Sequence, residues 1–513
     1  MWVYFLITLL GVDFKNIRIN SDDTREVQNE EQICINPLNS KNLVAIWRDF
    51  RLGYRRVGVG YSLDGGLSWR DDLIEGTPYT KDSDPGLTYD SEGNFYAVIL
   101  SFESITEPNG IFLYKSQDGG KTWVGPFTVV DGVKGVFEDK ELIACDRTDS
   151  PYKGNLYVSW TRYSGEGVSD IFFTRSTDGG ETFEEPIRVN DYPDVQWSVP
   201  CVGKDGTVYV AWLKWAYGAP FMMLDKSTDG GLLFGKDIII TPIHFGYGEL
   251  KGGIGVFSYP ALDADISDSP YSGNLYIAYA DYGKNGDLDI YFIKSTDKGE
   301  SWTAPKRIND DPVDSKADQF HPWLCVDEKG VITVVFYDRR NDPDNLKMDV
   351  YLTQSFDGGE TFTKNVRVTD VSSGPTPLHT MAGLMGEYIG VAVRDGIVHP
   401  VWTDWREGDQ NVYTGVPSIG IEEKRVKPLQ RINLSPNPFK EFTVISFQLP
   451  AKMDVSLKVY DATGKLVRVL LRTQSLRPGV YNVKWEGKDL PSGIYFYELE
   501  LSGERIKGKA VKL

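Results

Sequence analysis

The sequence predicts an all-β protein in which a large repeat domain, built from four-stranded units, is followed by a small β-sandwich. Three observations lead to this prediction. An eight-residue pattern recurs, short runs of β-forming residues alternate with Gly, Pro and Asn turns, and no long segment shows sustained helical periodicity. The composition agrees, with 52 Gly, 27 Pro and 13% aromatic residues.

The recurring pattern reads Ser-x-Asp-x-Gly-x-x-aromatic and occurs six times. Its Asp accepts hydrogen bonds from nearby backbone N–H and hydroxyl groups, its Gly supplies a positive φ, and its aromatic ring packs under the turn. We therefore predict that the pattern staples a hairpin and has a structural role. It resembles the Asp-box (BNR) repeat of sialidases and related β-propellers. Its aspartates are Asp64, Asp118, Asp178, Asp229, Asp297 and Asp357.

Each repeat contains four short predicted strands, which indicates one propeller blade per repeat. A seventh unit, residues 388–414, supplies three strands and lacks the Asp pattern. Its fourth strand is expected at the other end of the chain, in Asn16–Asn20, because pairing the first strand with the last closes the ring. The predicted fold is a seven-bladed β-propeller, and the alternative is a six-bladed one, the number found in sialidases.

The chain divides into four predicted segments. Residues 1–11 are an apolar run without a basic start or a clear cleavage site, so we expect an imperfect signal peptide. The propeller is predicted for 12–420, a linker for 421–432 and the β-sandwich for 433–513. Through stretches such as Leu434–Phe439 and Val455–Gly464, the last segment resembles the C-terminal sorting domain of the type IX secretion system, which is similar to the Ig-like module of flagellar hook-capping proteins. This resemblance implies a secreted or cell-surface protein that contacts the secretion machinery.

Charge and metal-ligating residues exclude several classes of partner. The net charge of −18 argues against nucleic acid, and no segment of the mature chain is apolar enough to cross a membrane. The four cysteines lie in first strands of different repeats and are expected to be free and buried. The four histidines show no metal-ligand spacing. Acidic loops at 263–268 and 285–289 could hold Ca²⁺, but such clusters are usually only solvated, so no cofactor is expected.

Sialidases hold the carboxylate of their substrate with three arginines, because a guanidinium offers paired N–H donors in carboxylate geometry. The first of these arginines lies two residues before the Pro of a first strand. None of the seven residues at this position is arginine, so the resemblance covers the scaffold and not the catalytic set. The seven residues are Glu31, Ser83, Asp139, Ser198, Ser258, Phe320 and Glu387.

A different pattern, aromatic-x-Asp-x-Arg, follows the second strand in three repeats that are neighbours around a closed ring. One interpretation is a shared binding site for an acidic sugar or another anion, and the other is a local ion pair that braces each loop. Glu31 and Glu387, which would lie one blade apart, are candidates for an acid and base pair of glycoside cleavage. The pattern residues are Asp49 and Arg51, Asp338 and Arg340, and Asp404 and Arg406.

Two classes of function remain. The first is an exported protein that binds extracellular glycans or glycoproteins or acts as a surface scaffold, which the missing arginine favours. The alternative is a glycoside hydrolase, sialidase-like or other, that acts on extracellular glycans. The family resemblance alone points to sugars, because a fold does not determine a function.

Overall fold

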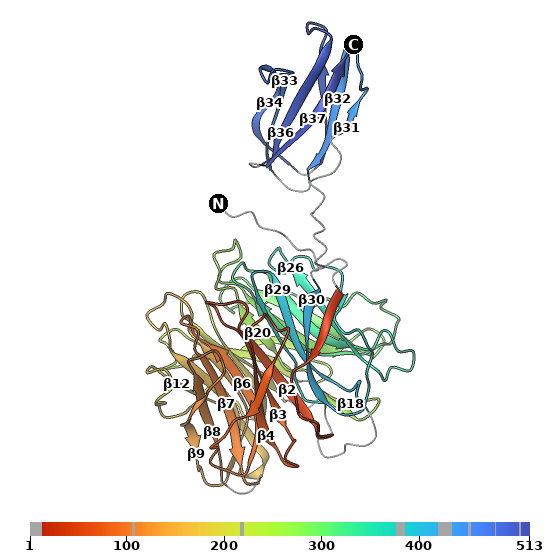
Figure 1. The fold of residues 1–513 in the computed structure, drawn as a ribbon. Helices are drawn as coiled ribbons and strands as arrows, with labels where there is room; N and C mark the ends of the chain where they lie inside the picture. The colour runs from red at the N-terminus through yellow and green to blue at the C-terminus, as the bar shows by residue number, and fades with distance from the viewer. Residues whose placement is uncertain are drawn as a thin grey trace. The chain divides into compact units, whose positions relative to one another are not determined.

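The structure is a computed structural model that describes residues 13–104, 108–215, 220–375, 385–418, 433–449, 453–477, 479–501 and 504–513. The chain divides into two compact units, Met1–Ser418 and Ile419–Leu513 (Figure 1). No helix in the described ranges is long and apolar enough to cross a membrane. One short 3₁₀ turn, η1 (Gly165–Gly167), accompanies the strands.

The first unit consists of four-stranded antiparallel sheets that follow one another along the chain. The first three are β2 (Gln28–Ile35), β3 (Leu43–Asp49), β4 (Arg56–Ser62) and β5 (Arg70–Leu73); β6 (Lys81–Tyr89), β7 (Phe95–Phe102), β8 (Asn109–Ser116) and β9 (Val124–Asp131); and β10 (Val136–Cys145), β11 (Leu156–Ser164), β12 (Val168–Ser176) and β13 (Ile187–Arg188). The next three are β14 (Val195–Val202), β15 (Val208–Lys214), β16 (Phe221–Ser227) and β17 (Ile238–Pro242); β20 (Ala261–Ala264), β21 (Leu275–Tyr282), β22 (Leu288–Ser295) and β23 (Lys306–Arg307); and β24 (Gln319–Val326), β25 (Ile332–Asp338), β26 (Asp349–Ser355) and β27 (Val366–Arg367).

A further sheet joins the two ends of this unit. Its strands are β28 (Gly390–Arg394), β29 (Ile397–Asp404), β30 (Asn411–Ser418) and β1 (Asp13–Arg18). The N-terminal β1 pairs antiparallel with β30, with Ile17 opposite Thr414, so the predicted pairing of the first and last strands is confirmed. The four-stranded sheets in the described part of this unit number seven, as the predicted seven-bladed fold requires.

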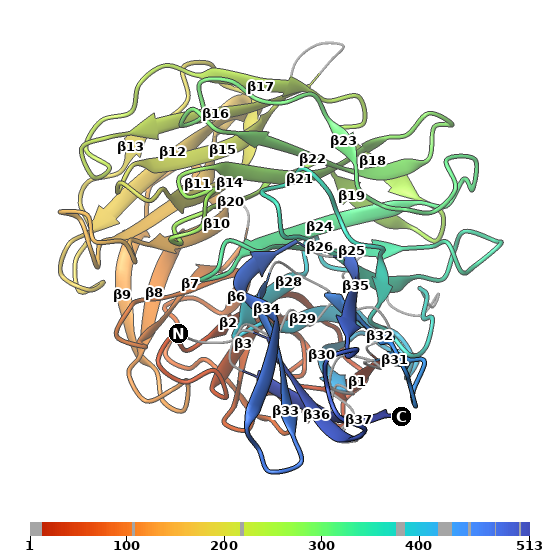
Figure 2. The ribbon, with the colours of Figure 1, turned by 90° about the horizontal axis from the view of Figure 1, so that it is seen from above.

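The first strand of each sheet lies on the inside of the ring. Strands β2, β6, β10, β14, β20, β24 and β28 contact one another in this cyclic order, and Figure 2 shows their labels around the centre. Because the strand 1–2 turns and the Asp-box hairpins meet at the carboxyl ends of these strands, we call this side the Asp-box end. The Asn42 side chain, for example, donates to the carbonyl of Gly119 in the next Asp box (2.9 Å). The cysteines are free, and Cys325 is only partly buried, unlike the other three.

Large apolar side chains fill the space between neighbouring sheets. Trp47, Trp160, Trp212 and Trp402 occupy second strands and are almost completely buried. Gly58 on β4 pairs with Trp47 and leaves room for the indole, since a Cβ at this position would lie 2.4 Å from the ring. Glycine is therefore required here by a close approach rather than by a turn.

One hairpin lies outside the repeated pattern. Strands β18 (Tyr247–Leu250) and β19 (Ile254–Phe257) pair between β17 and β20. At its tip, Lys251 donates to the carbonyl of Asp344 and accepts at its own carbonyl from Arg339 (3.0 Å). The hairpin is thus fastened to the loops of the β24–β27 sheet.

The second unit is a sandwich of two antiparallel sheets. Its core includes Ile445, Leu457, Trp485 and Leu499, all fully buried. The sheets have the strand orders β31-β32-β35 and β34-β33-β36-β37. Their strands are β31 (Asn433–Ser435), β32 (Phe442–Leu449), β33 (Met453–Asp461), β34 (Leu466–Leu476), β35 (Gly479–Glu486), β36 (Gly493–Leu501) and β37 (Glu504–Lys512).

Candidate functional site

Five of the inner strands carry the same irregularity near their amino ends. The register of each shifts against the second strand, which is the mark of a β-bulge, and one residue at the shift has a positive φ between 46° and 64°. A bulge re-aims a side chain, and non-glycine residues in this conformation cluster at functional sites. We call this side of the ring the bulged end. The five residues are Glu30, Asp84, Lys140, Trp197 and His321.

The side chains of Glu30 and Asp84, two of these five residues, contact that of a third, Lys140. Its ammonium forms ion pairs with Glu30 (3.4 Å), with Asp84 and with Glu387, which come from three other sheets or their loops. Arg48 pairs with Glu30 from the second strand (3.0 Å). Side-chain exposure in this Lys140 cluster is 10% or less, so two cations and three carboxylates are held away from bulk water.

Aromatic rings surround the cluster and continue outward from it. The Lys140 ammonium lies 5.0 Å from the centre of the Trp197 ring, a cation–π distance. Trp197 stacks on Tyr259 (5.1 Å between centres) and contacts Phe257 (5.0 Å). Phe257 contacts Tyr247 across the hairpin (4.4 Å), and Tyr247 is 52% exposed. These four rings, which we call the aromatic series, connect solvent with the Lys140 cluster.

The titratable groups of the Lys140 cluster have perturbed pKa values. Burial would lower the pKa of Lys140, but the carboxylates of Asp84, Glu30 and Glu387 hold it well above its usual value. Burial would raise the pKa of Asp84, but the Lys140 and Arg48 cations keep it below its usual value. Asp84 is therefore ionised and Lys140 protonated at neutral pH.

The pKa values of other titratable groups nearby are shifted toward the neutral form. Burial, followed by the charge of Asp84, raises the pKa of Asp139 to about 7 and that of Glu141 well above its usual value. Burial raises the pKa of Glu31 to about 8, and burial lowers that of His321 to about 3. Ionised and neutral groups thus lie close together, which is an arrangement found at functional sites.

Several buried polar atoms at this end have no hydrogen-bond partner within the described chain. Both carboxyl oxygens of Glu141, both ring nitrogens of His321, the hydroxyls of Tyr259 and Tyr388 and the indole N–H of Trp197 are in this state. A cavity of about 10 Å³ lies between Lys140, Glu141, Trp197, Ser198, Tyr259 and Tyr388, room for about one water molecule. Unpaired buried polar groups are unfavourable, so this concentration of them marks the bulged end as a candidate binding site.

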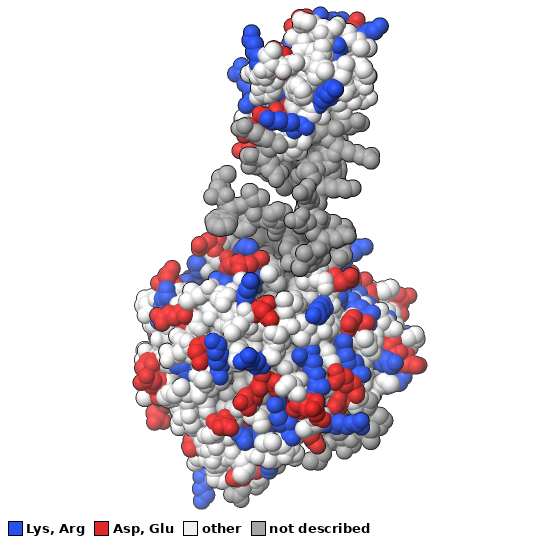
Figure 3. All heavy atoms as spheres, viewed as in Figure 1, with Lys and Arg blue, Asp and Glu red and all other residues white. Residues whose placement is uncertain are grey.

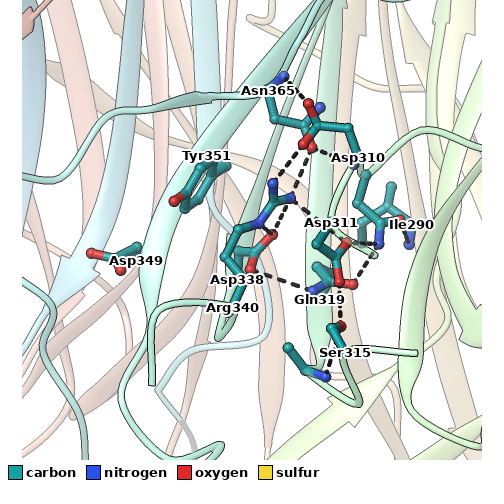
Figure 4. A network of polar contacts seen from close by, with 12 residues as sticks. Ile290, Asp310, Asp311, Ser315, Gln319, Asp338, Arg340, Asp349, Tyr351 and Asn365 are labelled. Carbon is teal, nitrogen blue, oxygen red and sulfur yellow. Dashed lines mark hydrogen bonds and ion pairs between the residues drawn. The ribbon is translucent and has the colours of Figure 1, made fainter. Parts of the chain in front are cut away.

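The structure separates the three predicted Asp-x-Arg pairs. Arg340 donates through Nε to Asp338 (2.8 Å), through Nη1 to Asp310 (2.5 Å) and through Nη2 to Asn365 (2.8 Å). Figure 4 shows the guanidinium enclosed by these groups. Asp310 follows the last strand of the preceding sheet, so Arg340 ties two blades together.

The guanidiniums of Arg406 and Arg51 are likewise paired with carboxylates. Arg406 binds Asp404 (2.8 Å) within its own sheet and Asp370 (2.6 Å) beyond the last strand of the preceding one. Arg51 binds Asp49 (2.7 Å) and Asp71 (2.9 Å). Among the described residues no hydrogen bond or ion pair joins one of these three pairs to another. The local bracing interpretation agrees with this geometry, and a shared anion site at the three pairs stays a prediction.

Glu31 and Glu387, the predicted acid and base pair, both lie at the bulged end. Glu31 accepts a hydrogen bond from the Thr403 hydroxyl (3.0 Å), whereas Glu387 pairs with Lys140. Lys140 itself was not predicted, although it directly follows Asp139 at the position compared with the sialidase arginine. The available signal is a run of four charged residues, Glu138 to Glu141, inside a predicted inner strand.

The predicted Asp boxes have the contacts of a hairpin staple. In the third copy Asp178 accepts hydrogen bonds from the Ser176 hydroxyl (2.7 Å), the Thr182 N–H (3.0 Å) and the Thr182 hydroxyl (2.5 Å). Hydrogen bonds to the carboxylate outweigh burial and lower the pKa of Asp178 to about 2. Equivalent Ser-to-Asp bonds occur at Asp64, Asp118, Asp229, Asp297 and Asp357.

Carboxylates that could bind a metal are otherwise engaged. Glu30, Asp84 and Glu387 are the one acidic group of suitable geometry in the described chain, and the Lys140 ammonium contacts all three. The predicted loop at 263–268 begins within β20, and after this strand Asp265 accepts hydrogen bonds from Ser267 and Ser269 (2.6 Å for the latter). Calcium at the acidic loops stays a prediction. Figure 3 shows acidic and basic side chains mixed over the visible face rather than gathered by sign.

Comparisons with known proteins agree with this architecture. Residues 433–512 match the family described as "Secretion system C-terminal sorting domain". An ulvan lyase of polysaccharide lyase family PL25 has a similar structure, with a TM-score of 0.50, 11% identity, and coverage of 79% of this chain and 96% of the other. The Hadza microbial sialidase Hz136 scores 0.44, with 16% identity and 74% of each chain covered. A protein of unknown function from Dyadobacter fermentans scores 0.45, with 13% identity and coverage of 79% and 99%.

The search of curated proteins gives no significant match. At such low identity the structural likeness shows the fold alone, and it agrees with the ring of four-stranded sheets. The match of residues 433–512 to the sorting domain indicates that the chain is exported by type IX secretion. The protein therefore combines a β-propeller with a C-terminal type IX sorting domain, and it is secreted or displayed at the cell surface.

Proposed function

We propose that the propeller binds extracellular glycans at the bulged end. The aromatic series is the observation that carries this proposal. Sugar rings stack through their C–H faces on exposed aromatic side chains, and Tyr247 is 52% exposed at the outer end of the series. From Tyr247, rings in direct contact lead to Trp197 and the unpaired polar atoms beside it.

The charges at this end favour a neutral sugar over an acidic one. Lys140 and Arg48 supply two positive charges against the three carboxylates around them, and Arg48 is already paired with Glu30. The guanidinium of this cluster, that of Arg48, is buried and already binds Glu30 and Asn29, so it is not open to the carboxylate of a ligand. A neutral sugar needs no such partner, since its hydroxyls both donate and accept, and the unpaired Glu141 carboxyl and Tyr388 hydroxyl line a cavity with room for about one water molecule.

Affinity electrophoresis of the full chain tests this proposal. We expect gels that contain neutral polysaccharides such as arabinan, xylan or β-glucan to retard the protein, and Tyr247→Ala to weaken the retardation at least tenfold. Tyr192→Ala is the matched control, since Tyr192 is 65% exposed and lies outside the aromatic series. Equal loss of retardation in both variants, or no retardation by any gel, would overturn the proposal.

A glycoside hydrolase is the second candidate, and the paired acid–base states favour it. Asp139 has a pKa raised by burial to about 7, close to the value of an efficient general acid, and Asp84 nearby is ionised. Two carboxyl groups in opposite states are what glycoside cleavage needs. Chromatography of the same polysaccharides after incubation distinguishes the candidates. Sugar released by the parent protein and lost with Asp139→Asn, with retardation unchanged, identifies an enzyme.

A further inference from the structure

A second pocket lies at the Asp-box end of the ring, on the axis. Its volume is about 160 Å³, and residues near the carboxyl ends of the inner strands line it. The Lys140 cluster lies nearer the amino ends of the same strands, and Leu142, Val199 and Trp323 line both this pocket and the small cavity beside the cluster. Polar members of its lining include Tyr89, Arg147, Asp263 and Arg394.

Two arginines of this pocket are unpaired. Among the described residues neither Arg147 nor Arg394 has a hydrogen bond or an ion pair, in contrast to Arg340 and Arg406, whose guanidiniums are fully engaged. The Arg147 guanidinium lies 4.4 Å from the centre of the Tyr89 ring. Stacking on a ring uses the face of a guanidinium and leaves the N–H donors at its edge free for a ligand.

The carboxylate in the pocket does not neutralise these arginines by pairing. Asp263 accepts hydrogen bonds from the backbone N–H groups of Ala264 (2.8 Å) and Val326 (2.8 Å), which fixes it against the chain. It interacts electrostatically with Arg147, but no ion pair forms between them. Two guanidiniums against one carboxylate leave the lining with an excess positive charge in a protein whose total is −18.

We infer that this pocket binds a small sugar that carries an oxyanion, either a carboxylate or a sulfate. Two unpaired guanidiniums supply the paired N–H donors that such groups accept from. The Tyr89 ring supplies an apolar face, and a volume of about 160 Å³ suits one sugar ring rather than a chain. This inference is independent of the proposed function, because the two arginines and Tyr89 have no residue in common with the aromatic series.

Isothermal titration of the full chain at constant ionic strength tests the inference. The probes are D-glucuronate, D-glucose 6-sulfate, D-glucose and sodium sulfate. We expect at least one charged sugar to bind ten or more times more tightly than glucose, and the preferred one identifies the oxyanion. Glucose binding as tightly as both, or sodium sulfate binding as tightly as either sugar, would overturn the inference.

Two variants locate the binding. Arg394→Gln and Arg147→Lys should each weaken binding of the preferred sugar at least tenfold, the second because lysine keeps the charge but loses the paired donors. Arg188→Gln, on a half-exposed side chain of an outer strand, is the control. Unchanged affinity in both pocket variants, with the melting temperature also unchanged, would overturn the assignment. Tyr247→Ala should leave this binding intact, so failure of the proposed function and failure of this inference are distinguishable.

Discussion

The ammonium of Lys140 lies 5.0 Å from the centre of the Trp197 ring and joins the inner strands β10 and β14. The same ammonium reaches Glu30 on β2, Asp84 on β6 and Glu387, which precedes β28. One side chain therefore contacts residues from four other parts of the ring. Because its partners come from so many sheets, Lys140 stabilises the closed ring as well as shaping the candidate site.

Lys140→Met should destabilise the propeller strongly. Removing one partner of a buried ion pair leaves uncompensated carboxylates and typically costs about 3–5 kcal/mol. We expect the free energy of unfolding to fall by this amount when the protein is denatured with urea at pH 7 and unfolding is monitored by tryptophan fluorescence. Lys134→Met, on an exposed lysine, serves as the control. A loss below about 1 kcal/mol would mean that the cluster does not stabilise the ring.

Glu31→Gln should make stability less dependent on pH. Burial raises the pKa of Glu31 to about 8 in the folded chain, whereas an unfolded Glu titrates at about 4.3. As the pH rises between these values the unfolded chain releases its proton while the folded chain retains it, so the stability of the parent falls. The amide side chain of the variant does not titrate, so it escapes this loss, and it can still accept from Thr403.

The variant should therefore match the parent near pH 4 and exceed it at pH 8. The gain should reach a few kcal/mol, at about 1.4 kcal/mol for each unit of pKa difference. Urea denaturation at both pH values measures it, and Glu26→Gln, on an exposed side chain, controls for the change of charge. A variant that is less stable than the parent at pH 8 would show that Glu31 is ionised in the folded protein.

The repeated part of the fold was predictable because the repeat itself carries the information. The spacing of the Asp boxes indicated the sheets, and the similarity of Asn16–Asn20 to other fourth strands placed the N-terminal strand beside β30, where β1 (Asp13–Arg18) lies. The β18–β19 hairpin was not predicted, since it has no counterpart in other repeats. Its position depends on contacts with the distant Asp344 and Arg339.

The candidate site was less predictable, because bulges decide which side chains point to the axis. A regular strand alternates its side chains, and the shift at Asp139 changes which of four consecutive charged residues joins the cluster. The residue at the position of the first sialidase arginine is Asp139, one residue before Lys140. No sequence pattern marks Arg147 and Arg394, since they come from different repeats and only closure of the ring brings them to one pocket.

Arg406→Gln should separate bracing from glycan binding. The variant loses ion pairs to Asp404 and Asp370, of which the second joins neighbouring sheets. We expect the free energy of unfolding to fall by about 1.5–3 kcal/mol, the range for hydrogen bonds to charged groups, because the buried Asp404 carboxylate loses its partner. Retardation by polysaccharide gels should stay unchanged. Weaker retardation without a change in stability would instead support an anion site at the Asp-x-Arg pairs.

Asp178→Ala should destabilise the propeller through the hairpin that the residue staples. The change removes the acceptor of the Thr182 N–H and hydroxyl, and each such bond contributes about 1 kcal/mol. Because the pKa of Asp178 is lowered to about 2, its stabilising effect is complete above about pH 4 and falls as the pH drops through 2. The difference in melting temperature between variant and parent should therefore be larger at pH 7 than at pH 2.5.

Glu181→Ala, in the same hairpin and exposed, is the control. An Asp178 variant that melts like this control at pH 7 would refute the structural role of the Asp box.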